Sequence, residues 1–166
     1  MKKKILYGVL ILLGIIVIAF VYYVVAPAFI KIRVDEAVPV SEIREQEQQE
    51  QQQEQRETQT PSVSAQIIGT TGHPASGTVR NLTIEGKQYI RYENFKTING
   101  PDLYVYLAKD LDAKEYVNLG VLRATEGNVN YEVPADVNVS EYRYVMVWCK
   151  QFSVLFNYAD MLEVSI

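Results

Sequence analysis

The run 144–156 (Y-V-M-V-W-C-K-Q-F-S-V-L-F) constrains the fold of this chain more than any other stretch. It carries the only cysteine, Cys149, and the only tryptophan, Trp148. Val, Tyr, Phe and Trp favour strands, and the run contains neither glycine nor proline. Apart from Lys150, Gln151 and Ser153, apolar residues occupy both faces, which predicts strand structure that is buried on both sides.

From Ala65 onward, short β-type runs alternate with turn residues. Glu85-Gly86-Lys87 indicates a hairpin, and a turn is expected at 99–102. The spacing predicts a single all-β domain of about eight or nine strands, a β-sandwich or barrel-like fold. We expect a loop at 72–77 and, at 137–142, either a loop or a short helical turn. The expected strands are 66–70, 78–84, 88–95, 103–108, 116–122, 129–133, 142–149 and 152–156, with 162–166 as a further candidate.

The N-terminal part of the chain contains an uncharged run of 26 residues, 5–30, rich in Ile, Val and Leu. About 20 apolar residues span a bilayer, so the run predicts a transmembrane helix over 5–28 that ends near Pro27. Tyr22 and Tyr23 lie where an interfacial aromatic belt is expected. The lysines at 2–4 predict a cytoplasmic tail over 1–4 and a domain outside the cell membrane.

A cleaved signal peptide is the competing interpretation of this run. Ala26-Pro27-Ala28 has the small-x-small pattern of a cleavage site. The apolar core of a signal peptide is only about 7–15 residues long, however, and this one is clearly longer. We therefore expect an uncleaved signal-anchor and a single-pass membrane protein.

A Gln/Glu-rich segment, 42–60, follows, and Ile43 is its only apolar residue. Without an apolar seam it cannot form a coiled coil, and it has no core to bury. We expect 29–64 to be a polar stalk or linker and 65–166 to be the external β-domain. A Gln-rich partner-binding segment is the alternative.

Composition excludes several classes of function. The part of the chain after residue 60 has nine basic and twelve acidic residues without a basic cluster, so nucleic acid is not an expected partner. A single cysteine excludes an intrachain disulfide and a cysteine-based metal site, and no metal site is expected. His73 is the only histidine and is expected to be a solvated loop residue, and no spacing suggests a catalytic triad around it.

Cys149 is the candidate for chemistry, and three roles are open. It can be a small buried hydrophobe, a redox-active thiol, or an axial ligand to haem iron. Because neighbouring residues of a strand point to opposite faces, Trp148 is expected to point away from Cys149. The domain also has nine tyrosines, which can stabilise strand pairs or form a recognition face.

Several motifs occur in a familiar order. They are Gly77-x-Val79, Tyr92-Glu93-Asn94-Phe95, Gly100-Pro101-Asp102-Leu103-Tyr104-Val105, Leu119-Gly120, and V-W-C-x-x-F-x-V-x-F over 147–156. Together they resemble the DM-thirteen domain, an electron transfer family often found beside DOMON cytochrome domains. The resemblance covers about 77–161.

The resemblance implies an extracytoplasmic β-domain whose hallmark cysteine, Cys149 here, works in redox chemistry as a bare thiol or by holding haem. The chain contains no DOMON domain, so the resemblance implies a redox protein partner at the cell surface. We therefore expect a membrane-anchored electron-transfer accessory, not a stand-alone enzyme. The alternative is a non-catalytic binding or structural β-domain with a core cysteine.

Overall fold

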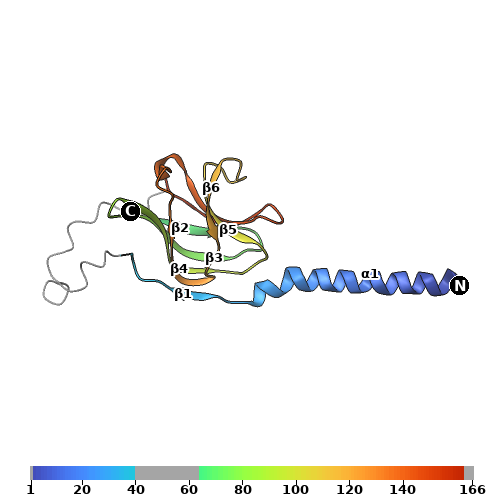
Figure 1. Cartoon of the computed structure of the whole chain (residues 1–166). Helices are drawn as coiled ribbons and strands as arrows, with labels where there is room; N and C mark the ends of the chain where they lie inside the picture. Colours follow the sequence, from blue (N-terminus) through green and yellow to red (C-terminus); the bar gives the residue numbers. More distant parts are fainter. Residues whose placement is uncertain (1, 40–63, 163–166) are drawn as a thin grey trace.

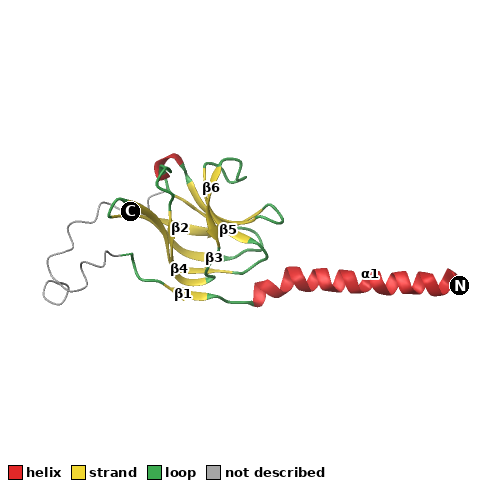
Figure 2. Ribbon diagram, viewed as in Figure 1, coloured by secondary structure: helices red, strands yellow, loops and turns green. Residues whose placement is uncertain are grey.

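The computed structural model describes residues 2–39 and 64–162. It consists of one long helix and a β-domain from which the helix projects (Figures 1 and 2). The helix α1 runs over Lys2–Val25 and is followed by a 3-10 turn, Ala26–Phe29, that contains Pro27. Proline lacks the N–H that a continuing helix needs, so the α-helix ends where the sequence predicted.

The helix α1 is apolar around its whole circumference, and its side chains are exposed rather than packed on the domain. By length and composition it could cross a membrane. A signal sequence close to the N-terminus can also be long and apolar enough to meet this criterion. The structure thus shows an apolar helix that fits the predicted span.

The β-domain is one curled sheet of nine strands in the order β1-β7-β4-β3-β2-β9-β8-β5-β6. This confirms the predicted all-β, barrel-like class. Only the β1–β7 pair is parallel, and all other neighbours are antiparallel. The strands are β1 (Arg33–Asp35), β2 (Ser64–Gly69), β3 (Ala75–Ile84), β4 (Lys87–Thr97), β5 (Leu103–Ala108), β6 (Tyr116–Val121), β7 (Glu126–Glu132), β8 (Tyr144–Cys149) and β9 (Val154–Asp160).

Local turn chemistry explains the hairpins. Glu85 and Gly86 both have positive φ, 51° and 78°, as a two-residue turn of type I′ requires, and they join β3 to β4 as predicted. The run 144–156 contributes to two strands, as predicted, since the chain reverses at 150–153 between β8 and β9. Ser153 has a φ of 52° there, which ends the extended conformation.

Three other expectations concern a loop, a helical turn and the C-terminal residues. The predicted loop 72–77 is shorter, because β3 begins at Ala75 and absorbs Gly77 in a bulge against β4. The helical alternative for 137–142 is correct, since a 3-10 turn spans Val139–Glu141 and the side chain of Asn138 accepts a hydrogen bond from the Ser140 N–H. The candidate strand 162–166 lies outside the described residues beyond Leu162.

The first strand was not expected. The range 29–64, predicted as a linker, contains β1, which pairs in parallel with β7 (Figure 1). The carbonyl oxygen of Ile32 accepts hydrogen bonds from the N–H groups of Thr125 (2.8 Å) and Glu126 (3.1 Å). The sheet is therefore joined directly to the chain that leaves α1.

The inside of the curled sheet is the main hydrophobic core. Val79, Ile90, Val105, Val129 and Val147 are among its fully buried members. A smaller cluster covers the other face of β5 and β8. Strand β8 lies between β5 and β9 and is buried on both faces, as its composition predicted.

Candidate functional site

Cys149 is the last residue of β8, and only 1% of its surface is exposed. Its side chain belongs to the main core, and the Sγ–H donates to the carbonyl oxygen of Pro101 at 3.1 Å. The register pairs Cys149 with Leu103, the first residue of β5, so the preceding turn 99–102 lies over the thiol. The N–H of Lys150 donates to the carbonyl oxygen of Asp102 at 3.0 Å and closes this cover.

The covering turn is tightly built. The N–H of Gly100 donates to Oδ1 of Asn99 at 2.9 Å. A Cβ at Gly100 would lie 2.8 Å from the ring of Phe156, so a larger residue would force this ring or the turn to shift. Asp102 has a φ of 60°, an uncommon conformation for a residue with a side chain. Access to the thiol therefore requires this turn to move.

His73 lies at the same end of the sheet. It was expected to be a solvated loop residue, but its side chain is half-buried. Its ring stacks on Phe156 with the centroids 3.9 Å apart, and Nδ1 is 3.1 Å from Oγ1 of Thr70. Burial against these groups lowers the pKa of the imidazole below its ordinary value. Among the contacts that the structure describes, none joins His73 to Cys149, so the two do not form a ligand pair.

Trp148 points to the opposite face from Cys149, as the alternation of the strand predicted. On that face the tyrosines pack against one another: Tyr106 stacks on Tyr116 with centroids 4.2 Å apart, and Tyr144 meets Tyr158 edge to face at 5.9 Å. Burial raises the pKa of Tyr106 to about 12. These contacts show the tyrosines stabilising neighbouring strands.

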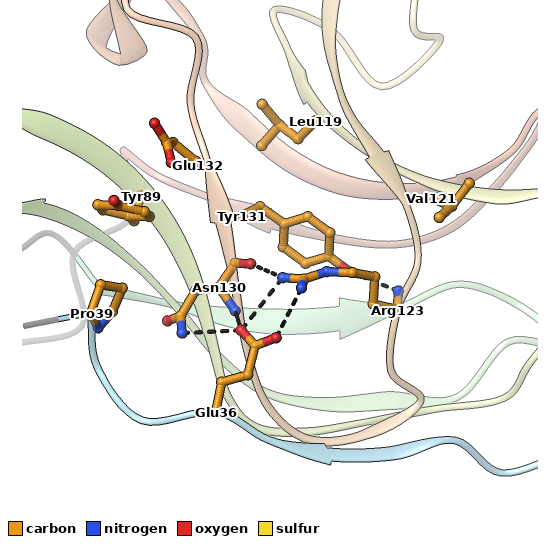
Figure 3. A pocket seen from close by; sticks show the side chains of 9 residues that line it. All are labelled: Glu36, Pro39, Tyr89, Leu119, Val121, Arg123, Asn130, Tyr131 and Glu132. Atoms are coloured by element: carbon orange, nitrogen blue, oxygen red, sulfur yellow. Dashed lines mark hydrogen bonds and ion pairs between the residues drawn. The ribbon is translucent and has the colours of Figure 1, made fainter.

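An open cleft of about 500 Å³ lies away from Cys149, between the chain that follows β1 and strands β6 and β7 (Figure 3). Its polar groups are largely paired with one another: the guanidinium of Arg123 pairs with Glu36 at 2.9 Å and lies 5.0 Å from the Tyr131 ring centre. No sequence pattern indicates this cleft, because its walls come from four distant segments without any shared motif. The lining residues are Glu36, Pro39, Tyr89, Leu119, Val121, Arg123, Asn130, Tyr131 and Glu132.

The surroundings of Cys149 do not fit a haem. An axial thiolate needs open space beside its sulfur for the iron and the macrocycle. Here the sulfur is buried, donates to a backbone carbonyl and is covered by the turn 99–102. Among the described residues, no three His, Cys, Asp or Glu side chains gather as a metal site.

Comparisons with known proteins bear on this site. The family described as "Electron transfer DM13" matches residues 68–161, which include the covering turn and Cys149. Neither the curated proteins nor the solved structures gave a significant match. The matched range spans strands β3 to β9 and more than half of the chain. The chain therefore belongs to the electron transfer DM13 family.

Proposed function

We propose that this protein is a membrane-anchored, extracytoplasmic electron-transfer module in which the thiol of Cys149 is the redox group. The match to an electron transfer family over residues 68–161 carries the proposal. The apolar helix α1, which is long enough to span a bilayer, supports the anchoring. The protein acts as an accessory that exchanges electrons with a redox protein partner at the membrane.

The chemistry available to a single thiol is exchange with sulfur from another molecule. The Cys149 sulfur, on losing its proton, attacks a disulfide of the partner. The partner's S–S bond breaks, a mixed S–S bond forms, and the departing partner thiolate takes up a proton. The turn 99–102 must first withdraw the Pro101 carbonyl, so the resting state holds Cys149 as a protected thiol.

A second candidate is a non-catalytic binding or structural domain. The burial of Cys149 favours it, because a thiol that is 1% exposed and packed in a core behaves as a small hydrophobe. The two candidates differ in whether the turn 99–102 opens in the native state. Thiol reactivity therefore distinguishes them.

The test is the rate of thiol modification in the folded full-length chain, with Cys149→Ser as the blank. Gly100→Ala places a Cβ against the Phe156 ring and is expected to displace the turn and speed modification severalfold. Gly14→Ala in α1 is the control, because its Cβ meets open space and its φ is not positive. The redox proposal would be refuted if the thiol reacted only after denaturation in all variants and no absorption band appeared on adding haem. The non-catalytic binding or structural role would then remain.

The topology has its own test. In a Cys149→Ser background, Lys3→Cys places a single thiol near the N-terminus, and Thr83→Cys places one at an exposed position of strand β3. A membrane-impermeant maleimide is expected to label Thr83→Cys, and not Lys3→Cys, on intact cells. The mass of the purified protein tests cleavage after Ala28. Reversed labelling would contradict the proposed orientation. A mass that lacks residues 1–28 would contradict the uncleaved anchor.

A further inference from the structure

The register of the strands shows at which end of the sheet α1 joins the domain. Arg33, the first residue of β1, pairs with Glu126, and Glu126 pairs with Lys96 near the end of β4. The chain from α1 therefore enters at the end of the sheet that carries the β4–β5 and β8–β9 connections, here called the entry end. The β3–β4 turn, at Glu85 and Gly86, lies at the other end.

The entry end is close to the end of the helix. Only residues 30–32 separate the 3-10 turn, which ends at Phe29, from β1. The distance from Phe29 to Arg33 is at most about 14 Å even in an extended chain. The hydroxyl of Tyr23, in the last turns of α1, donates to Oε1 of Gln151 in the β8–β9 turn at 3.0 Å. This turn thus lies beside the part of α1 where an interfacial tyrosine is expected.

The β8–β9 turn, residues 150–153, exposes apolar and cationic groups together. Phe152 is 41% exposed, and Val154 beside it is 36% exposed. Lys150 is also exposed, and its ammonium lies 5.4 Å from the ring centre of Tyr104. Aromatic rings and lysines are the side chains that favour the boundary between headgroups and acyl chains.

The two ends of the sheet also differ in charge. At the entry end, cations outnumber carboxylates, with Lys31, Arg33, Lys96 and Lys150 against Asp102 and Glu126. The β5–β6 and β7–β8 connections at the other end carry Asp110, Asp112, Glu115, Asp136 and Glu141 against Lys109, Lys114 and Arg143. A surface of anionic lipid attracts the first end and repels the second.

We propose that the β8–β9 turn rests on a lipid surface that contains anionic headgroups, with Phe152 in the interface and Lys150 among the headgroups. This contact holds the entry end, and with it the covered thiol of Cys149, against the bilayer. The inference rests on the anchoring in the proposed function and adds the surface from which Cys149 is approached. A redox partner then reaches the covering turn 99–102 from the membrane plane.

Fluorescence quenching by brominated lipids tests the contact in the full chain reconstituted into phosphatidylcholine–phosphatidylglycerol vesicles. A Trp148→Phe background removes the native indole, and Phe152→Trp places a single probe in the turn. Thr83→Trp is the control, because the exposed Thr83 lies about 25 Å along β3 from the entry end at the usual rise per residue. Lipids brominated near the headgroup should quench most of the emission of Phe152→Trp and little of Thr83→Trp.

Lipid charge gives a second readout. Omitting phosphatidylglycerol, or adding Lys150→Gln, should weaken the quenching of Phe152→Trp, since either change removes attraction between the turn and anionic headgroups. Equal quenching of the two probes, or none at Phe152→Trp in protein that floats with the vesicles, would overturn the inference and leave the anchor in place. If the protein failed to float with the vesicles, both the membrane anchor and the lipid contact of the turn would be refuted. If the Cys149 thiol proved inert while Phe152→Trp was still quenched, only the proposed redox role would be refuted.

Discussion

Gly127 offers a direct test of how the sheet is tied to the N-terminal segment. It lies in β7 with a φ of 109°, and an added Cβ would overlap the carbonyl oxygen of Val34 in β1. Because the overlapping atom is backbone, Gly127→Ala should displace β1 from the sheet. Gly120 has nearly the same φ, 116°, with open space around its missing Cβ, so Gly120→Ala is the matched control.

The magnitude follows from the hydrogen bonds that the residues flanking β1 make with the β7 segment. The N–H of Glu36 donates to Asn128 at 2.9 Å, and the carbonyl of Ile32 accepts from Thr125 and Glu126. At roughly 0.5–1.5 kcal/mol each, three such bonds contribute roughly 2–4 kcal/mol. A side chain at positive φ adds a cost of roughly 1–2 kcal/mol in both variants.

We therefore expect Gly127→Ala to lower the free energy of unfolding by roughly 3–6 kcal/mol and Gly120→Ala by roughly 1–2 kcal/mol. Urea denaturation of the full chain measures the two losses. Amide exchange at Glu36 should accelerate more than about tenfold in Gly127→Ala only, since 1.4 kcal/mol corresponds to a factor of ten. Equal losses in the two variants, or an unchanged Glu36 amide in Gly127→Ala, would refute the pairing of β1 with β7.

The other expectations concern the core and its titratable groups. Ile90 is fully buried, so Ile90→Ala should cost about 2–5 kcal/mol and Ile90→Val about 0.5–1.5 kcal/mol in urea denaturation; near-equal costs would contradict the packing. Hydrogen bonds from Arg143 lower the pKa of Asp160, so this carboxylate stabilises the fold above its unfolded pKa of about 3.9, and the contribution disappears as the pH falls through the lower folded pKa. Asp160→Asn should flatten that acid dependence, and an unchanged profile would exclude the pair as its cause. Burial against Phe156 lowers the pKa of His73, so its contribution is present above about pH 6.5 and disappears as the pH falls through the folded pKa. His73→Gln should remove this dependence from urea midpoints, and its persistence would assign the effect to another group.

Local sequence patterns determined much of the sheet. Glu85-Gly86 predicted the hairpin because a two-residue turn needs positive φ at both positions. Strand β5, Leu103–Ala108, has the predicted bounds, and β8 has the predicted burial on both faces. The run 144–156 divides into two strands as predicted, but β9 continues to Asp160, beyond the predicted end at 156.

The candidate site was only partly predictable. Cys149 stands out as the single cysteine, and strand alternation placed Trp148 on the other face. The cover over the thiol could not be foreseen, because the Pro101 carbonyl comes from a turn 48 positions away in the chain. The stacking of His73 on Phe156 likewise joins two segments that only the β2–β9 pairing brings together.

The sequence by itself determined the apolar helix, the β-class of the domain and the approximate positions of most strands, since these depend on apolar length, period-two alternation and turn residues. Only the tertiary structure decided that Arg33–Asp35 is a strand, because three residues carry no periodic signal and pair with β7 more than 90 positions later. That pairing also decided which end of the sheet meets α1. Contacts between distant segments form when a strand finds the edge that completes its hydrogen bonds, and no local pattern records that edge.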